Sequence, residues 1–218
     1  NLYNLNKARK VSNKYNEVYL VEGYMDVISL YGNKIYNCVA NLGTALTNKQ
    51  ILLLGQFFSE IIVCFDGDES GYKAALRAAE NSLKFLQPEK QISFLFLPDG
   101  EDPDSFVKNK GKEQFLKYSE NNKIQIHSFI FNHYINNSKK TPTELAMIEK
   151  KLTNLANTIE DSIVKKYLLG FFLEQLSNFL PSKISFKNKN HRYKAVKSLE
   201  ITKNIYNETQ KYSSAEIK

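Results

Sequence analysis

The stretch EIIVCFDGDESGYKAALRAAE (60–80) decides the fold. Its first six residues, EIIVCF (60–65), form an apolar run of β-branched and aromatic residues, which is typical of a buried strand. A polar turn follows, and a helix with alanines on a face suited to close packing is predicted from about Tyr72 to Leu86. A strand that is apolar on both faces and leads into a helix indicates a parallel sheet covered by helices.

The same alternation of strands and helices extends over about residues 16–120. Three more buried strands are predicted in EVYLV (17–21), IYNCVA (35–40) and QISFLFL (91–97). Helices are predicted over about 25–31 and 47–58, the second capped by Thr47, and in a short stretch that ends near Tyr118. We therefore expect an α/β fold with a mostly parallel four-stranded sheet flanked by helices.

The pattern changes after about residue 121, where an all-α helical subdomain is predicted. Its helices are expected over 124–135, from Thr141 to about Ile159, and over 161–180. TPTE (141–144) reads as a capping box in which Thr141 caps, Pro142 takes the first helical position and Glu144 reaches back. The predicted domains are a lead-in segment (1–15), an α/β domain (16–120), a helical bundle (121–180) and a basic, mobile linker (181–218).

Composition describes an ordinary folded chain with an uneven charge. The net charge of +7 lies almost wholly in residues 181–218, which hold 9 of the 30 Lys and Arg but 3 of the 23 Asp and Glu.

No apolar stretch approaches the roughly 20 residues of a membrane span. Cys38 and Cys64 lie in apolar runs and are expected to be buried free thiols, which fits the cytoplasm. The chain starts at Asn1, so we expect a piece of a longer protein.

Acidic residues gather in three islands, and each island follows a predicted strand. Because the carboxyl ends of parallel strands share one edge of a sheet, the islands are expected to converge there. The six candidates are Glu22 and Asp26 in VEGYMD, Asp66 and Asp68 in FDGD, and Asp102 and Asp104 in EDPD.

Carboxylates this close raise one another's pKa unless a cation holds them, and oxygen ligands suit Mg²⁺ and Mn²⁺. Asp66 and Asp68 are two residues apart, so in an extended segment both face the same way. Each island alone could be a surface turn or a helix N-terminus. The three together favour a metal site for phosphate chemistry.

Four segments resemble one known family. VEGYMDVISL (21–30), ANLGTALT (40–47), FDGDESGYKAALRA (65–78) and LPDGEDPDSF (97–106) are similar to the Toprim domain of bacterial DNA primases. LYNLNKAR (2–9) is similar to the stretch that precedes this domain. The sequence departs from the family at Asn4, where Gly is usual, and at Ser70, where Ala is usual.

The resemblance implies the roles of the acidic residues. Glu22, Asp66 and Asp68 would be the main metal ligands and catalytic groups, and Asp26, Asp102 and Asp104 would support them. Gly43 and Thr44, in the matched LGTALT segment, are expected to be packing or turn residues.

The resemblance also implies the activity and the partners. The chain would be part of a primase, a DNA-directed RNA polymerase that joins ribonucleoside triphosphates on single-stranded DNA with Mg²⁺ or Mn²⁺. It would act in the cytoplasm, at the replication fork in the nucleoid. Zinc binding and docking to the replicative helicase belong to regions that this sequence lacks, and no membrane is involved. We expect the isolated fragment to be weakly active or inactive, since the basic half of the polymerase core is absent.

Two other function classes remain open. Toprim domains also occur in topoisomerases and in some nucleases, so a Toprim-type enzyme that cuts DNA phosphodiesters is the alternative. A third reading is a non-catalytic binding module whose helices and tail dock onto a partner protein.

Overall fold

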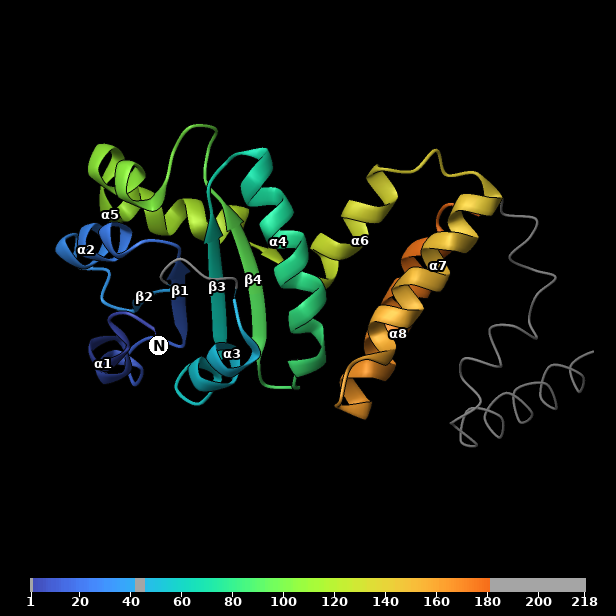
Figure 1. The fold of residues 1–218 in the computed structure, drawn as a ribbon, viewed down its shortest axis with the longest axis horizontal. Helices are drawn as coiled ribbons and strands as arrows, with labels where there is room; N and C mark the ends of the chain where they lie inside the picture. Colours follow the sequence, from blue (N-terminus) through green and yellow to red (C-terminus); the bar gives the residue numbers. More distant parts are fainter. Residues whose placement is uncertain (1, 42–45, 181–218) are drawn as a thin grey trace, which may run out of the picture. The chain divides into compact units, whose positions relative to one another are not determined.

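The computed structural model describes residues 2–41 and 46–180. A five-stranded sheet in the order β2-β1-β3-β4-β5 forms its centre (Figure 1). The strands are β1 (Glu17–Val21), β2 (Cys38–Ala40), β3 (Glu60–Phe65), β4 (Gln91–Phe96) and β5 (Ile124–Gln125). The first four are parallel to one another, which confirms the expected α/β class.

The fifth strand corrects the sequence-based expectation of a four-stranded sheet and of a helix that starts at 124. β5 pairs antiparallel with β4 through Gln125 with Ser93 and Ile124 with Phe94. Two residues are too few to show the alternation that marks a strand, so the apolar run of the following helix concealed it.

The two faces of the sheet pack against different helices. Along β3, Ile62 and Cys64 point into the core beneath α2 (Tyr24–Gly32) and α5 (Pro103–Asn122). Side chains alternate along a strand, so Phe65 faces the other side, where its ring contacts Phe94. The helices in contact with that side are α3 (Asn48–Gly55), α4 (Glu69–Ser82) and α6 (Ile126–Asn136). Both faces are therefore buried, as the apolar strands predicted.

The N-terminal segment packs on the edge strand β2. It forms α1 (Leu5–Ala8) and a 3₁₀ turn, η1 (Arg9–Val11), and Tyr3 pairs with Ala40. Asn4 precedes α1 with φ at 65°, in the left-handed region. Asn tolerates this conformation better than most residues, so it can stand where the family has Gly. Its side chain also donates a hydrogen bond of 2.9 Å to the Cys38 carbonyl oxygen.

Three helices follow β5, which are α6, α7 (Pro142–Asn157) and α8 (Ser162–Ser177). Earlier in the chain, a second 3₁₀ turn, η2 (Leu83–Phe85), follows α4. Thr141 caps α7 and Pro142 is its first residue, as predicted. The prediction that Glu144 completes a capping box is wrong, because its carboxylate accepts a hydrogen bond from Ser138 and does not reach back to Thr141.

Other expectations have mixed outcomes. Cys38 and Cys64 are buried and free. None of the helices in the described ranges is long and apolar enough to cross a membrane. Residues up to Glu174 form one compact unit, and the predicted division into four domains stays a prediction. The expected linker (181–218) lies outside the described residues.

Helix α5 is interrupted at Gly111, whose φ of 80° and ψ of 171° are not helical. This backbone region is almost restricted to glycine, because a Cβ clashes with the backbone there. The helix was expected to end near Tyr118, but it continues past the interruption to Asn122.

We predict that Gly111→Ala lowers the free energy of unfolding by about 1–3 kcal/mol, through backbone strain alone. Apart from the adjacent backbone, a Cβ at Gly111 or at Gly170 in α8 would meet no atom within 4 Å. Gly170→Ala is the matched control and should raise stability by about 0.5–1 kcal/mol, because alanine favours a regular helix. Urea unfolding of both variants measures this, and a shift of the same sign in both would refute the strain argument.

Candidate metal centre at the carboxyl edge of the sheet

The acidic islands follow neighbouring parallel strands, as predicted. Glu22 comes directly after β1 and Asp66 directly after β3, and these two strands pair in parallel. β4 pairs in parallel with β3 along its whole length and leads into the loop that carries Asp102. All three islands therefore start from the same edge of the sheet.

Gly67 brings the loops after β3 and β4 into direct contact. A Cβ at this position would lie 2.4 Å from the Leu97 carbonyl oxygen and 2.6 Å from that of Pro98. Real Cβ atoms do not approach backbone so closely, so only glycine fits. The FDGD loop is thereby held against the segment that leads to Asp102.

Two of the six acidic residues are also the N-caps of helices. Asp68 is the N-cap of α4, and its Oδ1 accepts a hydrogen bond of 2.6 Å from the Gly71 backbone N–H. Asp102 is the N-cap of α5, and its Oδ1 accepts one of 2.7 Å from Ser105 N–H. Such bonds fix the carboxylate orientation and complement the helix dipole, so the structural and the metal-binding readings of these residues are compatible.

Asp26 is buried in the first turn of α2, and its Oδ2 accepts a hydrogen bond of 3.0 Å from Gly23 N–H. Burial raises the pKa of Asp26 to about 6, the Gly23 N–H opposes the rise, and the charge of Asp102 adds to it. A carboxyl group with this pKa changes its charge close to neutral pH.

Negative charges act on one another across the edge. The pKa of Glu22 is raised by partial burial of its carboxylate and then by the charges of Asp66, Asp26 and Asp68. The pKa of Asp66 is raised by burial and then by Asp102 and Asp68. The charges of five of the six candidates therefore act on one another at this edge of the sheet.

Asp104 differs from the other five. It accepts hydrogen bonds from Ser29 Oγ and, at 2.8 Å, from Lys108 Nζ. These two donors, Lys108 before Ser29, hold the pKa of Asp104 below its ordinary value. Its negative charge is already compensated within the protein.

The chemistry of the donor set fits a hard divalent cation. Glu22, Asp66 and Asp26 supply only oxygen, their charges repel, and none of them forms an ion pair within the described part of the chain. Within residues 2–41 and 46–180, no three His, Cys, Asp or Glu side chains are already grouped to hold one ion. Mg²⁺ commonly uses one or two carboxylates, completing its shell with water and substrate phosphates, so this arrangement suits it.

Two residues at this edge escaped the sequence analysis. Ser29, the partner of Asp104, is a lone small polar residue in the apolar run of α2, three positions after Asp26. Glu101 pairs with Lys110 at 2.9 Å through Oε1, while its Oε2 is buried without a hydrogen-bond partner. A serine within the apolar run of α2 was a signal that the sequence offered for Ser29, and Glu101 is the first residue of the EDPD island.

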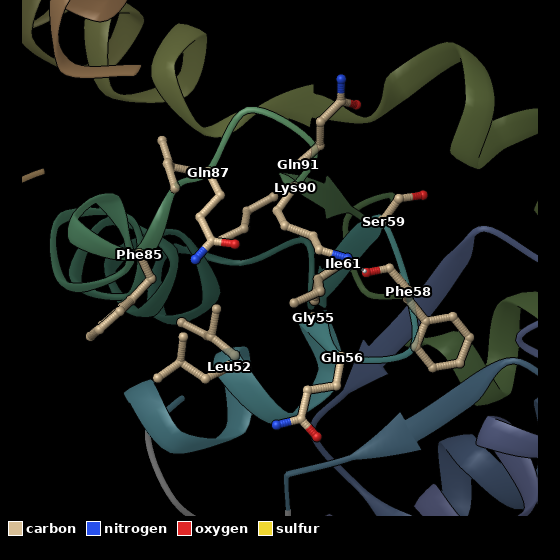
Figure 2. Close-up of a pocket in the computed structure, with 13 residues that line it drawn as sticks. Leu52, Gly55, Gln56, Phe58, Ser59, Ile61, Phe85, Gln87, Lys90 and Gln91 are labelled. Carbon is tan, nitrogen blue, oxygen red and sulfur yellow. Dashed lines mark hydrogen bonds between the residues drawn. The ribbon is translucent and has the colours of Figure 1, made fainter. Parts of the chain in front are cut away.

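A cavity of about 350 Å³ lies at the opposite edge of the sheet. Its lining includes Ser59 just before β3, Ile61 in β3 and Gln91 at the start of β4, and Figure 2 shows Leu52 and Phe85 beside them. No carboxylate is among its lining residues, and the Lys90 ammonium there donates to the Phe58 carbonyl oxygen at 3.2 Å. The cavity is therefore separate from the acidic edge.

Comparisons with known proteins identify the domain at residues 16–96 and the relatives of this chain. Residues 16–96 match the Toprim domain. The DNA primase of Rickettsia felis is 37% identical over 210 residues, which cover 91% of this chain and 35% of that protein. The chain thus spans about a third of the length of the curated relatives it matches.

Solved structures agree as well. A DNA primase domain from Pseudomonas aeruginosa shares 36% identity and a TM-score of 0.74, covering 82% of this chain and 55% of that one. A DnaG primase catalytic domain bound to single-stranded DNA shares 35% identity and a TM-score of 0.73, covering 81% and 56%.

We predict a pH-dependent contribution of Asp26 to stability in metal-free buffer. Because its folded pKa is raised to about 6 from 3.8, the folded state binds the extra proton between these pH values. The contribution of Asp26 is therefore most favourable below about pH 4 and is lost as pH rises through 6. The stability of Asp26→Asn relative to wild type should rise by about 1–2 kcal/mol from pH 4 to pH 7.

Chemical unfolding in EDTA at several pH values measures this difference. Asp99→Asn is the control, since it removes an exposed carboxylate from the neighbouring loop. A constant difference between Asp26→Asn and wild type across this range would contradict the prediction.

Proposed function

We propose that this chain, which belongs to the bacterial DNA primases and carries their Toprim domain at residues 16–96, is the metal-binding part of a primer-synthesising polymerase core. The reaction is nucleotidyl transfer, in which ribonucleoside triphosphates are joined on a single-stranded DNA template. The observation that carries the proposal is that Glu22, Asp66 and Asp68 follow the neighbouring parallel strands β1 and β3 at one edge of the sheet, where partial burial and like charges raise the pKa of Glu22 and Asp66. A structure gathers such charges at a cost in stability, which a bound cation removes.

Glu22, Asp66 and Asp68 are the proposed ligands, with Asp26 and Asp102 supporting them, and the cofactor is Mg²⁺ or Mn²⁺. When bound, such ions stabilise the attacking and leaving oxygens of phosphoryl transfer. The protein contributes fixed orientation, because Asp68 and Asp102 are held by backbone N–H groups. Gly67 contributes the close contact between the loops after β3 and β4, which keeps the FDGD loop against the segment that leads to Asp102.

The proposed partners follow from the relatives. Single-stranded DNA is bound by one solved DnaG catalytic domain of similar fold. Ribonucleoside triphosphates and a replicative helicase, the latter through a region outside this chain, are proposed in the same way. The site of action is the replication fork in the cytoplasm. The division into a Toprim domain (16–120) and a helical subdomain (121–180) is part of the same proposal.

We predict that Asp66→Asn lowers Mn²⁺ affinity at least 10-fold while the fold survives, because a charged ligand is lost. Metal-free Asp66→Asn should be at least as stable as wild type, since repulsion with Asp102 and Asp68 is relieved. Asp68→Ser should also lose affinity but keep α4 intact, because serine can replace the helix cap.

Calorimetric titration with Mn²⁺, together with thermal unfolding, tests both variants. Ser138→Ala is a control in the loop before α7 that leaves every acidic residue in place. Wild-type affinity in both Asp66→Asn and Asp68→Ser would refute the metal assignment.

Primer synthesis is best tested in a chimera. We predict that the Rickettsia felis primase retains template-directed primer synthesis when residues 2–180 of this chain replace its matching segment, and that Asp66→Asn in the chimera abolishes it. The chain alone should make little primer. A folded, Mn²⁺-binding chimera without activity would contradict the proposal, and Mn²⁺-dependent cutting of DNA by the chain alone would favour a Toprim nuclease.

A further inference from the structure

Asp104 lies in the first turn of α5 and joins that helix to α2. Its Oδ1 accepts a hydrogen bond from Ser29 Oγ, from a residue 75 positions earlier in the chain. Its Oδ2 accepts one of 2.8 Å from Lys108, one turn further along α5. Ser29 is buried, so its hydroxyl needs this acceptor, while the Lys108 side chain is 56% exposed.

Ser29 sits one helical turn after Asp26, on the same side of α2. Asp104 is likewise two residues after Asp102, the N-cap of α5. The bond between Ser29 and Asp104 therefore ties the helix that carries one candidate ligand to the helix that is capped by another.

We propose that Asp104 is a positioning residue and not a metal ligand: with Ser29 it forms a clamp that fixes α2 against α5 and so holds Asp26 and Asp102 toward the metal centre. This inference rests on the proposed function for the identity of the centre. Both oxygens of the Asp104 carboxylate already accept hydrogen bonds, one of them from an ammonium group. Because such charge-assisted bonds are strong, replacing them by bonds to a cation would gain little free energy.

The two roles predict different mutant series. A clamp needs an acceptor oxygen at position 104 and a donor at position 29, but no charge. Ser29→Ala and Asp104→Ala should each weaken Mn²⁺ binding about 10-fold, as the loss of a residue that orients a ligand does. The double variant should be no weaker than either single one, because both remove the same bond.

Conservative variants should restore the clamp. Asp104→Asn keeps an acceptor for Ser29 Oγ and Ser29→Thr keeps the hydroxyl, so both should lose far less affinity than the alanine variants. If Asp104 is a ligand, Asp104→Asn will instead lose as much as Asp104→Ala, and Ser29→Ala will bind Mn²⁺ like wild type; either result overturns the inference. Ser138→Ala, which removes another serine-to-carboxylate bond far along the chain, is the matched control.

A spectroscopic readout separates positioning from general loss of structure. Water-proton relaxation counts the water molecules on bound Mn²⁺, and this number should not change in Asp104→Ala if another residue supplies the coordination. An additional bound water in Asp104→Ala, absent in Ser29→Ala, would identify Asp104 as a ligand.

Hydrogen exchange in EDTA tests the clamp without any metal. Ser29→Ala and Asp104→Ala should speed exchange in residues 22–32 and leave β3 protected, whereas Asp104→Asn should not. Exchange unchanged in both alanine variants would overturn the clamp. Wild-type Mn²⁺ affinity in Asp66→Asn would defeat the proposed function instead, and the exchange result would still decide whether the clamp exists.

Discussion

The structure depends on the parallel pairing of β1, β3 and β4, because that pairing sends three acidic loops to one edge of the sheet. Gathering like charges is unfavourable, so burial elsewhere must supply the stability. It does so through side chains such as Ile62 and Phe94, which are fully buried on opposite faces of the sheet. The apolar core and the acidic edge are thus two consequences of one sheet, the first stabilising and the second destabilising until a cation binds.

Helix N-termini reduce part of this cost. Asp68 and Asp102 each accept a backbone N–H bond at the start of a helix, where the dipole favours negative charge. The same bonds keep the carboxylates in place before any cation arrives. A substitution at either position therefore changes two properties, helix stability and charge, and Asp68→Ser separates them because serine removes the charge and can still cap the helix.

Features that are encoded locally were readable from the sequence, and those that arise from tertiary contact were not. The apolar runs of β3 and β4 and the cap at Thr141 are local and were predicted. β5 has only two residues and is a strand because it pairs with β4, so no short stretch of sequence could predict it. The bond between Ser29 and Asp104 joins residues 75 positions apart, so no local pattern in the sequence could show it.

The distribution of charge gives the proposed cation a second effect. The basic excess of the chain lies in residues 181–218, so the rest of the chain is almost neutral and its acidic edge repels phosphate. Nucleic acid and nucleoside triphosphates are polyanions, and they can approach Glu22 and Asp66 only after those charges are compensated. In the proposed function a divalent cation must therefore occupy the edge before, or together with, the phosphates, and the same carboxylates that hold it set this order.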